Sequence, residues 1–175
     1  MEKRDWILFF LLWFILSNTG CRNSREVVYE HSDDQIEAYV NSILEFYSDK
    51  YGQYLTEVDD STRFPRTVRD EEVVYTGSSA WTSGFFPGIL WYLYKDTGDD
   101  SFKDAARKWT NSLYQEKNNT STHDIGFIMN CSYGLGFKFT GDTSYKKPLI
   151  EASESLASRY NGEIGMIKSL DDFEN

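Results

Sequence analysis

A repeat with a period of 43 residues is the feature that most restricts how this chain can fold. The sequence TGDDSFK begins at Thr97, and TGDTSYK begins 43 positions later at Thr140. A Gly-Phe step lies upstream of each copy, at Gly84 and at Gly126. A period of this size is typical of a supersecondary unit that buries its apolar face only by stacking on its neighbours.

The Thr-Gly-Asp triplet predicts the joint between two helices. Glycine readily takes the left-handed conformation that ends a helix, and an aspartate directly after it can cap the next helix. Apolar residues recur at helical spacing on either side of both joints and also in the first part of the chain. We therefore predict helical hairpins whose apolar faces lie in residues 36–47, 81–93, 102–113, 127–139 and 145–160.

The predicted fold class is all-α. No stretch alternates apolar and polar residues convincingly enough to predict a strand. The first helix is expected to end at Gly52, and residues 54–77, which contain Pro65, are expected to form a long ordered loop. The next helix is expected to begin near Trp81, with Pro87 in its first turns.

The N-terminus resembles an export signal. Lys3 and Arg4 precede an unbroken apolar run over residues 6–16, which is too short to span a membrane comfortably. Gly20 directly before Cys21 resembles the processing site of bacterial lipoproteins, in which the cysteine becomes the lipid-modified first residue. The alternative is an uncleaved anchor with an incidental cysteine.

These features predict three segments and a location. Residues 1–20 would be a lipoprotein-type signal peptide, residues 21–32 a tether, and residues 33–175 the folded domain. The protein would be exported and anchored to the membrane through a lipid on Cys21, on the periplasmic or cell-surface side.

The composition argues against nucleic acid as a partner and indicates no disulfide, metal site or cofactor. The net charge of −10 at pH 7 argues against nucleic acid, because phosphates demand a basic patch. With Cys21 lipidated, Cys131 would have no disulfide partner, and a lone cysteine in an apolar helical run is most often a small core residue. The sequence indicates no metal site and no cofactor.

Four segments carry a resemblance to a known family. They are RFPRT at residues 63–67, WTSGFFPG at 81–88, THDIGF at 122–127 and LASRYN at 156–161. Together they resemble the unsaturated glucuronyl hydrolases, glycoside hydrolase family 88, from about residue 35 to residue 171.

The resemblance implies an (α/α)6 barrel and a substrate class. The family removes the 4,5-unsaturated uronic acid that polysaccharide lyases leave on oligosaccharides such as those from glycosaminoglycans. A barrel of six hairpins needs roughly twice as many helices as we predict here. We therefore expect the chain to be the N-terminal part of such a domain.

The reaction of this family implies two carboxyl groups with separate roles. An acid protonates C4 of the double bond, water adds at C5, and the resulting hemiketal opens and releases the sugar. One carboxyl group donates the proton, while the other stays charged and stabilises the cation or orients the water. The resemblance places the first catalytic aspartate at Asp124. From the residues alone, Asp124 or Thr122 could instead cap a helix that begins near Ile125.

The resemblance also implies substrate contacts at His123 and at Trp81. An aromatic ring such as that of Trp81 can cover the apolar face of a pyranose in the sugar pocket. The alternatives are a structural role for His123 and a core position for Trp81, which lies on the apolar stripe of its predicted helix.

The chain departs from the family pattern in two places. Leu170 stands where the family has a tryptophan, which removes an aromatic expected near the substrate. The sequence ends at Asn175, before the segment in which the family carries its second catalytic aspartate. We therefore expect a fragment that lacks its proton donor and hydrates substrate slowly or not at all. Two alternatives are a rhamnogalacturonyl hydrolase-like enzyme and a non-catalytic, vestigial sugar-binding lipoprotein.

Overall fold

The structure is a computed structural model that describes residues 32–171. The predicted signal peptide, Cys21 and most of the predicted tether lie outside the described residues. The chain divides into two compact units, residues 1–38 and residues 39–175. The described part of the first unit is the start of the first helix, and the packing reported below belongs to the second.

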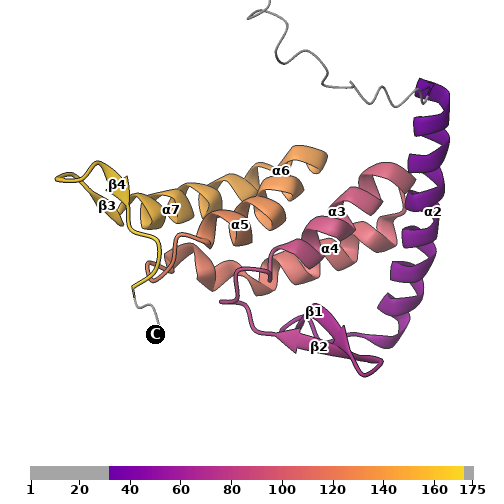
Figure 1. Cartoon of the computed structure of the whole chain (residues 1–175), viewed down its shortest axis with the longest axis horizontal. Helices are drawn as coiled ribbons and strands as arrows, with labels where there is room; N and C mark the ends of the chain where they lie inside the picture. The colour runs from indigo at the N-terminus through magenta and orange to yellow at the C-terminus, as the bar shows by residue number, and fades with distance from the viewer. Residues whose placement is uncertain (1–31, 172–175) are drawn as a thin grey trace, which may run out of the picture. The chain divides into compact units, whose positions relative to one another are not determined.

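Helices form most of the described chain (Figure 1). The elements η1 and η3 are short 3-10 helices, and η2 is one π-helical turn. Within residues 32–171, no helix combines the length and the apolar character that crossing a membrane requires. The elements in order are α2 (Asp33–Glu57), β1 (Phe64–Arg69), β2 (Glu72–Thr76), α3 (Phe85–Thr97), α4 (Asp100–Ser112), η1 (Tyr114–Asn118), α5 (Ile125–Met129), η2 (Asn130–Gly134), α6 (Leu135–Thr140), η3 (Thr143–Tyr145), α7 (Lys146–Ala157), β3 (Tyr160–Asn161) and β4 (Met166–Ile167).

The first copy of the repeat forms the predicted joint between α3 and α4. Gly98 has a φ of 69°, and its N–H donates to the carbonyl oxygen of Tyr94. The Asp99 carboxylate then accepts a hydrogen bond from the Ser101 N–H at 2.8 Å. Gly98 therefore ends one helix and Asp99 caps the next.

The second copy repeats this pattern between α6 and η3. Gly141 has a φ of 70°, and its N–H donates to the carbonyl oxygen of Phe137. The Asp142 carboxylate accepts from the Ser144 N–H at 2.9 Å. The prediction of helical hairpins with a common joint is confirmed at both copies.

The core lies between α3, α4 and the segment formed by α5, η2 and α6. Trp91 is fully buried, and its Nε1–H donates to Thr110 Oγ1 at 3.1 Å. The Trp91 ring packs closely on Gly136, where an added Cβ would lie 3.1 Å from the ring. Phe86 and Trp109 meet edge to face at 5.2 Å. The hairpins therefore bury one another's apolar faces, as the period predicts.

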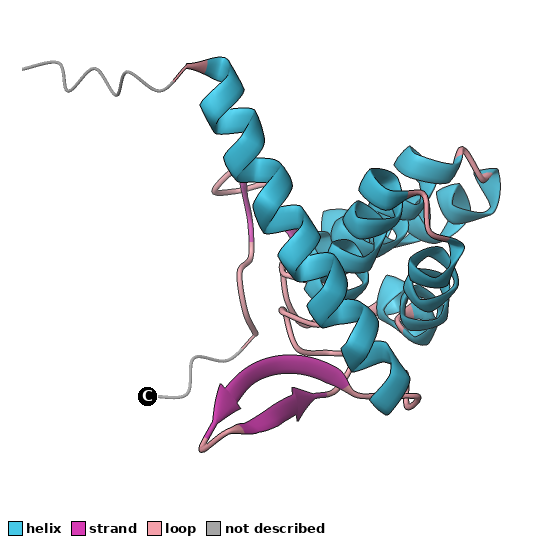
Figure 2. Cartoon of the chain, turned by 90° about the vertical axis from the view of Figure 1, so that its right-hand side faces the viewer, coloured by secondary structure: helices cyan, strands magenta, loops and turns pink. Residues whose placement is uncertain are grey.

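A β-hairpin stands within the predicted loop, so the expectation that the chain contains no strand was wrong. β1 pairs antiparallel with β2, beside the C-terminal end of α2 (Figures 1 and 2). The buried residue of β1 is Phe64, and the strand otherwise lacks the buried alternation that predicts a strand. Its turn uses Asp70 and Glu71, with φ of 48° and 66°, rather than the glycine that marks most such turns.

The helix α2 continues through Gly52 to Glu57, beyond its predicted end. Glycine inside a helix costs only about 1 kcal/mol relative to alanine. In this continuation of the helix, the side chains of Tyr54 and Leu55 pack against the core. Burial therefore outweighs the local preference.

The helix α3 begins at Phe85, later than predicted, because residues 78–84 form consecutive turns. Pro87 lies in its first turn, as predicted. Gly84 lies directly against α5: an added Cβ would come within 2.5 Å of the Ile128 carbonyl oxygen. This close approach holds the start of α3 against α5.

The predicted helical face over residues 127–139 is formed by α5, η2 and α6 in succession. The π-helical turn in the middle is a feature that often occurs at functional sites. Cys131 lies in this turn and is partly buried, and burial raises the pKa of its thiol.

Candidate functional site

The segment just before α5 carries the predicted site, and a distant segment holds it in place. Thr122 forms an isolated antiparallel bridge with Leu170. The His123 N–H donates to the Ser169 carbonyl oxygen at 2.9 Å. The residues around Ser169 therefore fix the backbone from which His123 and Asp124 project.

Asp124 is the residue before α5, but its side chain does not cap the helix. Its Oδ2 accepts from the Thr122 hydroxyl at 3.1 Å, and its Oδ1 lies 3.4 Å from His123 Nε2. The side chain is 20% exposed, so the carboxylate is largely enclosed yet reachable. The Thr122 hydroxyl also accepts from the Asp124 N–H at 3.0 Å, so Thr122 rather than Asp124 binds a backbone N–H at this end of α5.

His123 is the more exposed member of the pair, at 44% of its side chain. Its Nδ1 lies 3.1 Å from the Ser169 carbonyl oxygen and 3.1 Å from the Ser169 hydroxyl. The ring can donate from Nδ1 to this carbonyl, which leaves Nε2 beside Asp124. Contacts at both nitrogens fix the orientation of the ring.

Arg159, two positions after the end of α7, links the two segments. Its side chain is 4% exposed. Nη2 donates to the Ser169 carbonyl oxygen and Nε to the Lys168 carbonyl oxygen, both at 2.9 Å. Nη1 binds the Thr120 carbonyl oxygen and lies 3.2 Å from Asp171 Oδ1. Sequence reasoning gave Arg159 no role, since a single arginine after a helix does not reveal which distant carbonyls it will bind.

Asp171 forms ion pairs with a lysine and an arginine, whereas Asp124 lies beside His123. Its Oδ1 lies 3.2 Å from both Lys168 Nζ and Arg159 Nη1. Lys168 first, and Arg159 second, hold the pKa of the Asp171 carboxyl below its ordinary value. It is therefore a charged partner for Arg159 rather than a proton donor.

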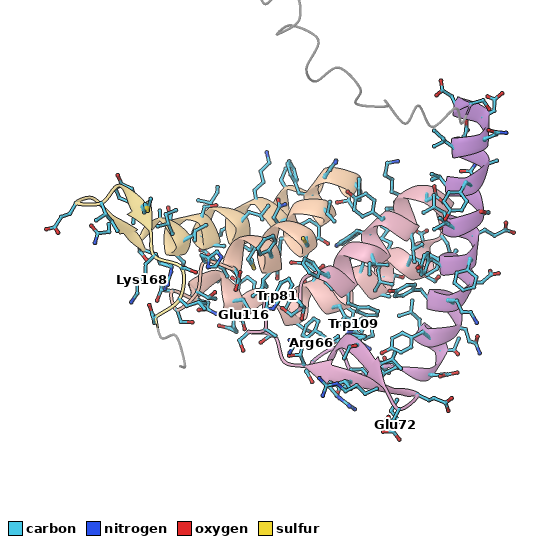
Figure 3. The ribbon with its side chains drawn as sticks, viewed as in Figure 1. Arg66, Glu72, Trp81, Trp109, Glu116 and Lys168 are labelled. Carbon is cyan, nitrogen blue, oxygen red and sulfur yellow. The ribbon has the colours of Figure 1, made fainter. Side chains whose placement is uncertain are left out.

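Trp81 is exposed, so the alternative of a core position does not describe it. It lies where the ribbons of α3 and α5 come together (Figure 3). Its ring meets Phe85 edge to face at 5.5 Å and Phe127 at 6.3 Å, and Phe85 and Phe127 are themselves 6.3 Å apart. We call Trp81, Phe85 and Phe127 the aromatic triad. Phe127 lies in α5, three positions after Asp124, so the triad and the carboxylate meet at the same end of α5.

The site therefore combines an enclosed carboxylate, an oriented imidazole and an exposed aromatic surface. Such a carboxylate can orient a water molecule or stabilise a developing positive charge, while the aromatic surface can cover a sugar ring. Within residues 32–171, no cluster of three histidine, cysteine or acidic side chains is placed to hold a metal ion.

Comparison with known proteins identifies relatives over part of the chain. The chain is 42% identical over 114 residues to the unsaturated glucuronyl hydrolase of Formosa agariphila, a match that covers 63% of this chain and 28% of that protein. A crystal structure of an unsaturated glucuronyl hydrolase specific for heparin superposes with a TM-score of 0.64 and 36% identity, covering 67% of this chain and 32% of that one. The homologues of this chain are unsaturated glucuronyl hydrolases.

Further relatives are also unsaturated glucuronyl hydrolases. The unsaturated glucuronyl hydrolase of Bacillus sp. strain GL1 is 28% identical over 123 residues, covering 69% of this chain and 30% of that protein. The crystal structure of the Bacillus sp. GL1 enzyme, described as responsible for the degradation of glycosaminoglycan, superposes with a TM-score of 0.64 and 25% identity. No family model matches the chain.

The fold prediction is confirmed: the described residues form part of the (α/α)6 barrel of the unsaturated glucuronyl hydrolases. The chain spans about 30% of the length of the curated relatives it matches. The structure brings Asp124 and His123 together and places Trp81 in the neighbouring aromatic triad. Their roles in catalysis and substrate binding stay predictions.

Proposed function

We propose that this chain contributes the Asp124 side of an active site that hydrates 4,5-unsaturated glucuronyl oligosaccharides. The observation that carries the proposal is the Asp124 carboxylate, which is bound by the Thr122 hydroxyl and flanked by His123 instead of capping α5. A carboxylate held in this way is poised for proton or water chemistry. The homology to unsaturated glucuronyl hydrolases supplies the substrate class.

The reaction would proceed by addition of water across the C4–C5 double bond. A proton adds to C4, and the oxygen of a water molecule bonds to C5 as that water loses a proton. The hemiketal formed at C5 then opens to a ketone, and the remaining sugar is released from C1. In this scheme Asp124 stays ionised, stabilises positive charge developing at C5 and the ring oxygen, and orients the water.

The neighbours of Asp124 would bind and orient the sugar. Trp81 presents an exposed ring that can cover the apolar face of the unsaturated pyranose. His123 can accept a hydrogen bond from a substrate hydroxyl through Nε2 while the contacts of Nδ1 with Ser169 keep its ring in place. We infer from the resemblance that the proton donor lies outside residues 32–171. Asp171 does not replace it, because its carboxylate is paired with Lys168 and Arg159.

We further propose that the substrates are fragments of glycosaminoglycans. The relatives include an unsaturated glucuronyl hydrolase specific for heparin and the unsaturated chondroitin disaccharide hydrolase of Streptococcus pneumoniae. We also propose that the protein is exported and anchored through a lipid on Cys21. This proposal is supported by the apolar run over residues 6–16 and by the Gly20-Cys21 pair.

The test uses both the chain alone and the chain completed with the remaining length of the Formosa agariphila relative. The assay is the loss of ultraviolet absorbance from the conjugated double bond of unsaturated disaccharides. We expect slow or no turnover from the chain alone and clear turnover from the completed protein. Asp124→Asn in the completed protein should lower kcat by about 10²–10⁴-fold.

A matched control is Asp142→Asn, which changes another aspartate but keeps a side chain able to cap η3. It should leave turnover unchanged. Full activity of the completed Asp124→Asn variant would refute the proposed role of Asp124. If the chain alone hydrated the disaccharides as fast as an intact relative does, no proton donor outside residues 32–171 would be needed, and that part of the proposal would be refuted.

A further inference from the structure

A second concave surface lies beside the aromatic triad. It is a groove of about 470 Å³ between the C-terminal half of α2, the β1–β2 hairpin and the start of α3. Tyr51 and Tyr54 of α2 and Phe85 of α3 contribute aromatic rings to its lining. Neither Asp124 nor His123 lines this groove, and it shares only Phe85 with the aromatic triad.

The charged residues that line the groove are both cations, in a chain whose net charge is −10. They are Lys50 and Arg66. Within residues 32–171, neither of them forms an ion pair. Arg63, three positions before Arg66, is occupied differently, because its guanidinium stacks on the Tyr75 ring at 4.0 Å. Lys50 Nζ lies 5.7 Å from the centroid of the Phe46 ring, a looser contact that leaves its charge without an acidic partner among the described residues. Arg66, which has neither an ion pair nor an aromatic contact among those residues, is the cation most available to an anion.

A β-bulge brings Arg66 to the groove. Pro65 pairs with Tyr75, and Thr67 pairs with the adjacent Val74, so Arg66 is an extra residue without a partner on β2. Bulges redirect a side chain from the face that simple alternation would give it, and they are frequent next to binding sites. In keeping with this, Pro65, Arg66 and Thr67 all line the groove.

The wall of the groove also contains a polar atom that no described residue satisfies. The Thr82 hydroxyl oxygen is buried and has no hydrogen-bond partner within residues 32–171. A buried hydroxyl without a partner destabilises a protein, and such groups need an explanation in a native structure. A hydroxyl or anionic oxygen of a bound ligand would supply the missing partner.

Phe85 connects this groove to the proposed active site, since it lines the groove and belongs to the aromatic triad. The triad ends at Phe127, three positions after Asp124. A ligand longer than one sugar could therefore extend from Asp124 across the triad and into the groove.

We propose that the groove is a distal subsite for an anionic sugar residue of the oligosaccharide. Lys50 and Arg66 would bind its carboxylate or sulfate, the aromatic rings would cover its apolar face, and Thr82 would bind one of its oxygens. The choice of a sugar as ligand rests on the proposed function, whereas the preference for an anion rests on the groove itself.

The test is binding of saturated tetrasaccharides, which contain no double bond to hydrate, to the chain by titration calorimetry. We use a sulfated glycosaminoglycan tetrasaccharide, its desulfated form and neutral cellotetraose. Arg66→Gln should weaken binding of the anionic sugars about tenfold or more, because it removes a charge-assisted contact. Arg69→Gln, on the same strand but outside the groove, removes the same charge. It should change the affinity less than about twofold if the ligand binds through direct contact with Arg66 and not through the net charge of the chain. Comparison of the two anionic sugars shows whether sulfate or carboxylate is the group bound.

A second variant tests the Thr82 hydroxyl. Thr82→Val replaces the unsatisfied group with a methyl of similar size, so it should raise the thermal midpoint of the free chain and weaken tetrasaccharide binding. The proposal would be overturned if Arg66→Gln and Arg69→Gln weakened binding of the anionic tetrasaccharides equally. It would also be overturned if cellotetraose bound as tightly as the anionic sugars. The proposal would also be overturned if the single variants Thr82→Val and Arg66→Gln both bound the tetrasaccharides with unchanged affinity.

The two proposals can fail separately. Asp124→Asn should keep tetrasaccharide binding. If the completed protein with Asp124 intact binds the tetrasaccharides but hydrates no unsaturated disaccharide, the proposed function is refuted and the subsite stands. Conversely, a completed enzyme that hydrates disaccharides but shows the same KM for unsaturated tetrasaccharides with and without Arg66→Gln would refute the subsite alone.

Discussion

Arg159 Nη2 and the backbone N–H of His123 donate to the same acceptor, the carbonyl oxygen of Ser169, each at 2.9 Å. A residue that follows α7 is thereby linked through one atom to the residue beside the proposed catalytic carboxylate. The link explains how a segment 46 positions away in sequence orients the His123 ring. It also makes Arg159 a positioning residue whose effect can be measured.

Arg159→Ala should destabilise the protein and release the His123 ring. The side chain binds three carbonyl oxygens and one carboxylate while largely buried, so its loss should lower the free energy of unfolding by about 2–4 kcal/mol. Urea unfolding measures this change, and the NMR signals of the His123 ring report its environment. Arg69→Ala, at an exposed position of β1, is the control and should alter neither the stability nor the His123 signals.

Arg159→Lys separates the positioning of His123 from the stability of the fold. If it restores stability but leaves the His123 signals displaced, positioning is supported; unchanged ring signals in Arg159→Ala would refute it.

The two capping aspartates should stabilise the protein only above acidic pH. Hydrogen bonds from Ser101 hold the pKa of Asp99 below its ordinary value, and those from Ser144 do the same for Asp142. Because each pKa is lower in the folded state, the stabilisation is present above the unfolded-state pKa, about 4, and is lost as the pH falls through the folded-state value.

Asp99→Ala and Asp142→Ala should therefore each lower the urea midpoint at pH 7, with effects that add in the double variant. The difference from the unaltered chain should shrink below about pH 4. Asp104→Ala, an exposed position inside α4, serves as the control. A midpoint difference that stayed constant down to pH 2 would contradict the capping explanation.

Gly84→Ala should be much more damaging than Gly126→Ala. At Gly84 the new Cβ would lie 2.5 Å from the Ile128 carbonyl oxygen, so α3 and α5 must move apart. We expect the free energy of unfolding to fall by about 1–3 kcal/mol or more. At Gly126 no atom lies within 4 Å of the added Cβ, and alanine favours the helix by up to about 1 kcal/mol. Chemical unfolding of both variants is the measurement, and similar losses in the two would show that the close approach is not the cause.

Cells that express the protein should incorporate labelled palmitate at Cys21. The apolar run over residues 6–16 and the Gly20-Cys21 pair motivate this expectation. Cys21→Ala should abolish the labelling and release the protein from the membrane fraction, whereas Cys131→Ala, the matched cysteine control, should not. Labelling that persists in Cys21→Ala would rule out the lipoprotein interpretation.

The sequence by itself determined the features that depend on neighbouring residues. The joints at Gly98 and Gly141 follow from glycine's access to positive φ and from an aspartate within reach of the next N–H groups, so short motifs were enough to predict them. The period of the repeat then required that the hairpins stack. The ordered motifs also indicated the family, and with it Asp124, His123 and Trp81 as candidates.

Only the tertiary structure decided the features that depend on distant partners. α2 continues past Gly52 because Tyr54 and Leu55 meet the core, and the β1–β2 hairpin forms although its exposed strand carries no buried alternation. The bulge at Arg66 and the meeting of Arg159 with Ser169 arise from backbone pairing and from carbonyl groups that every residue possesses. Side-chain patterns do not encode which of these identical backbone groups will meet, and that choice is made when the hairpins pack together.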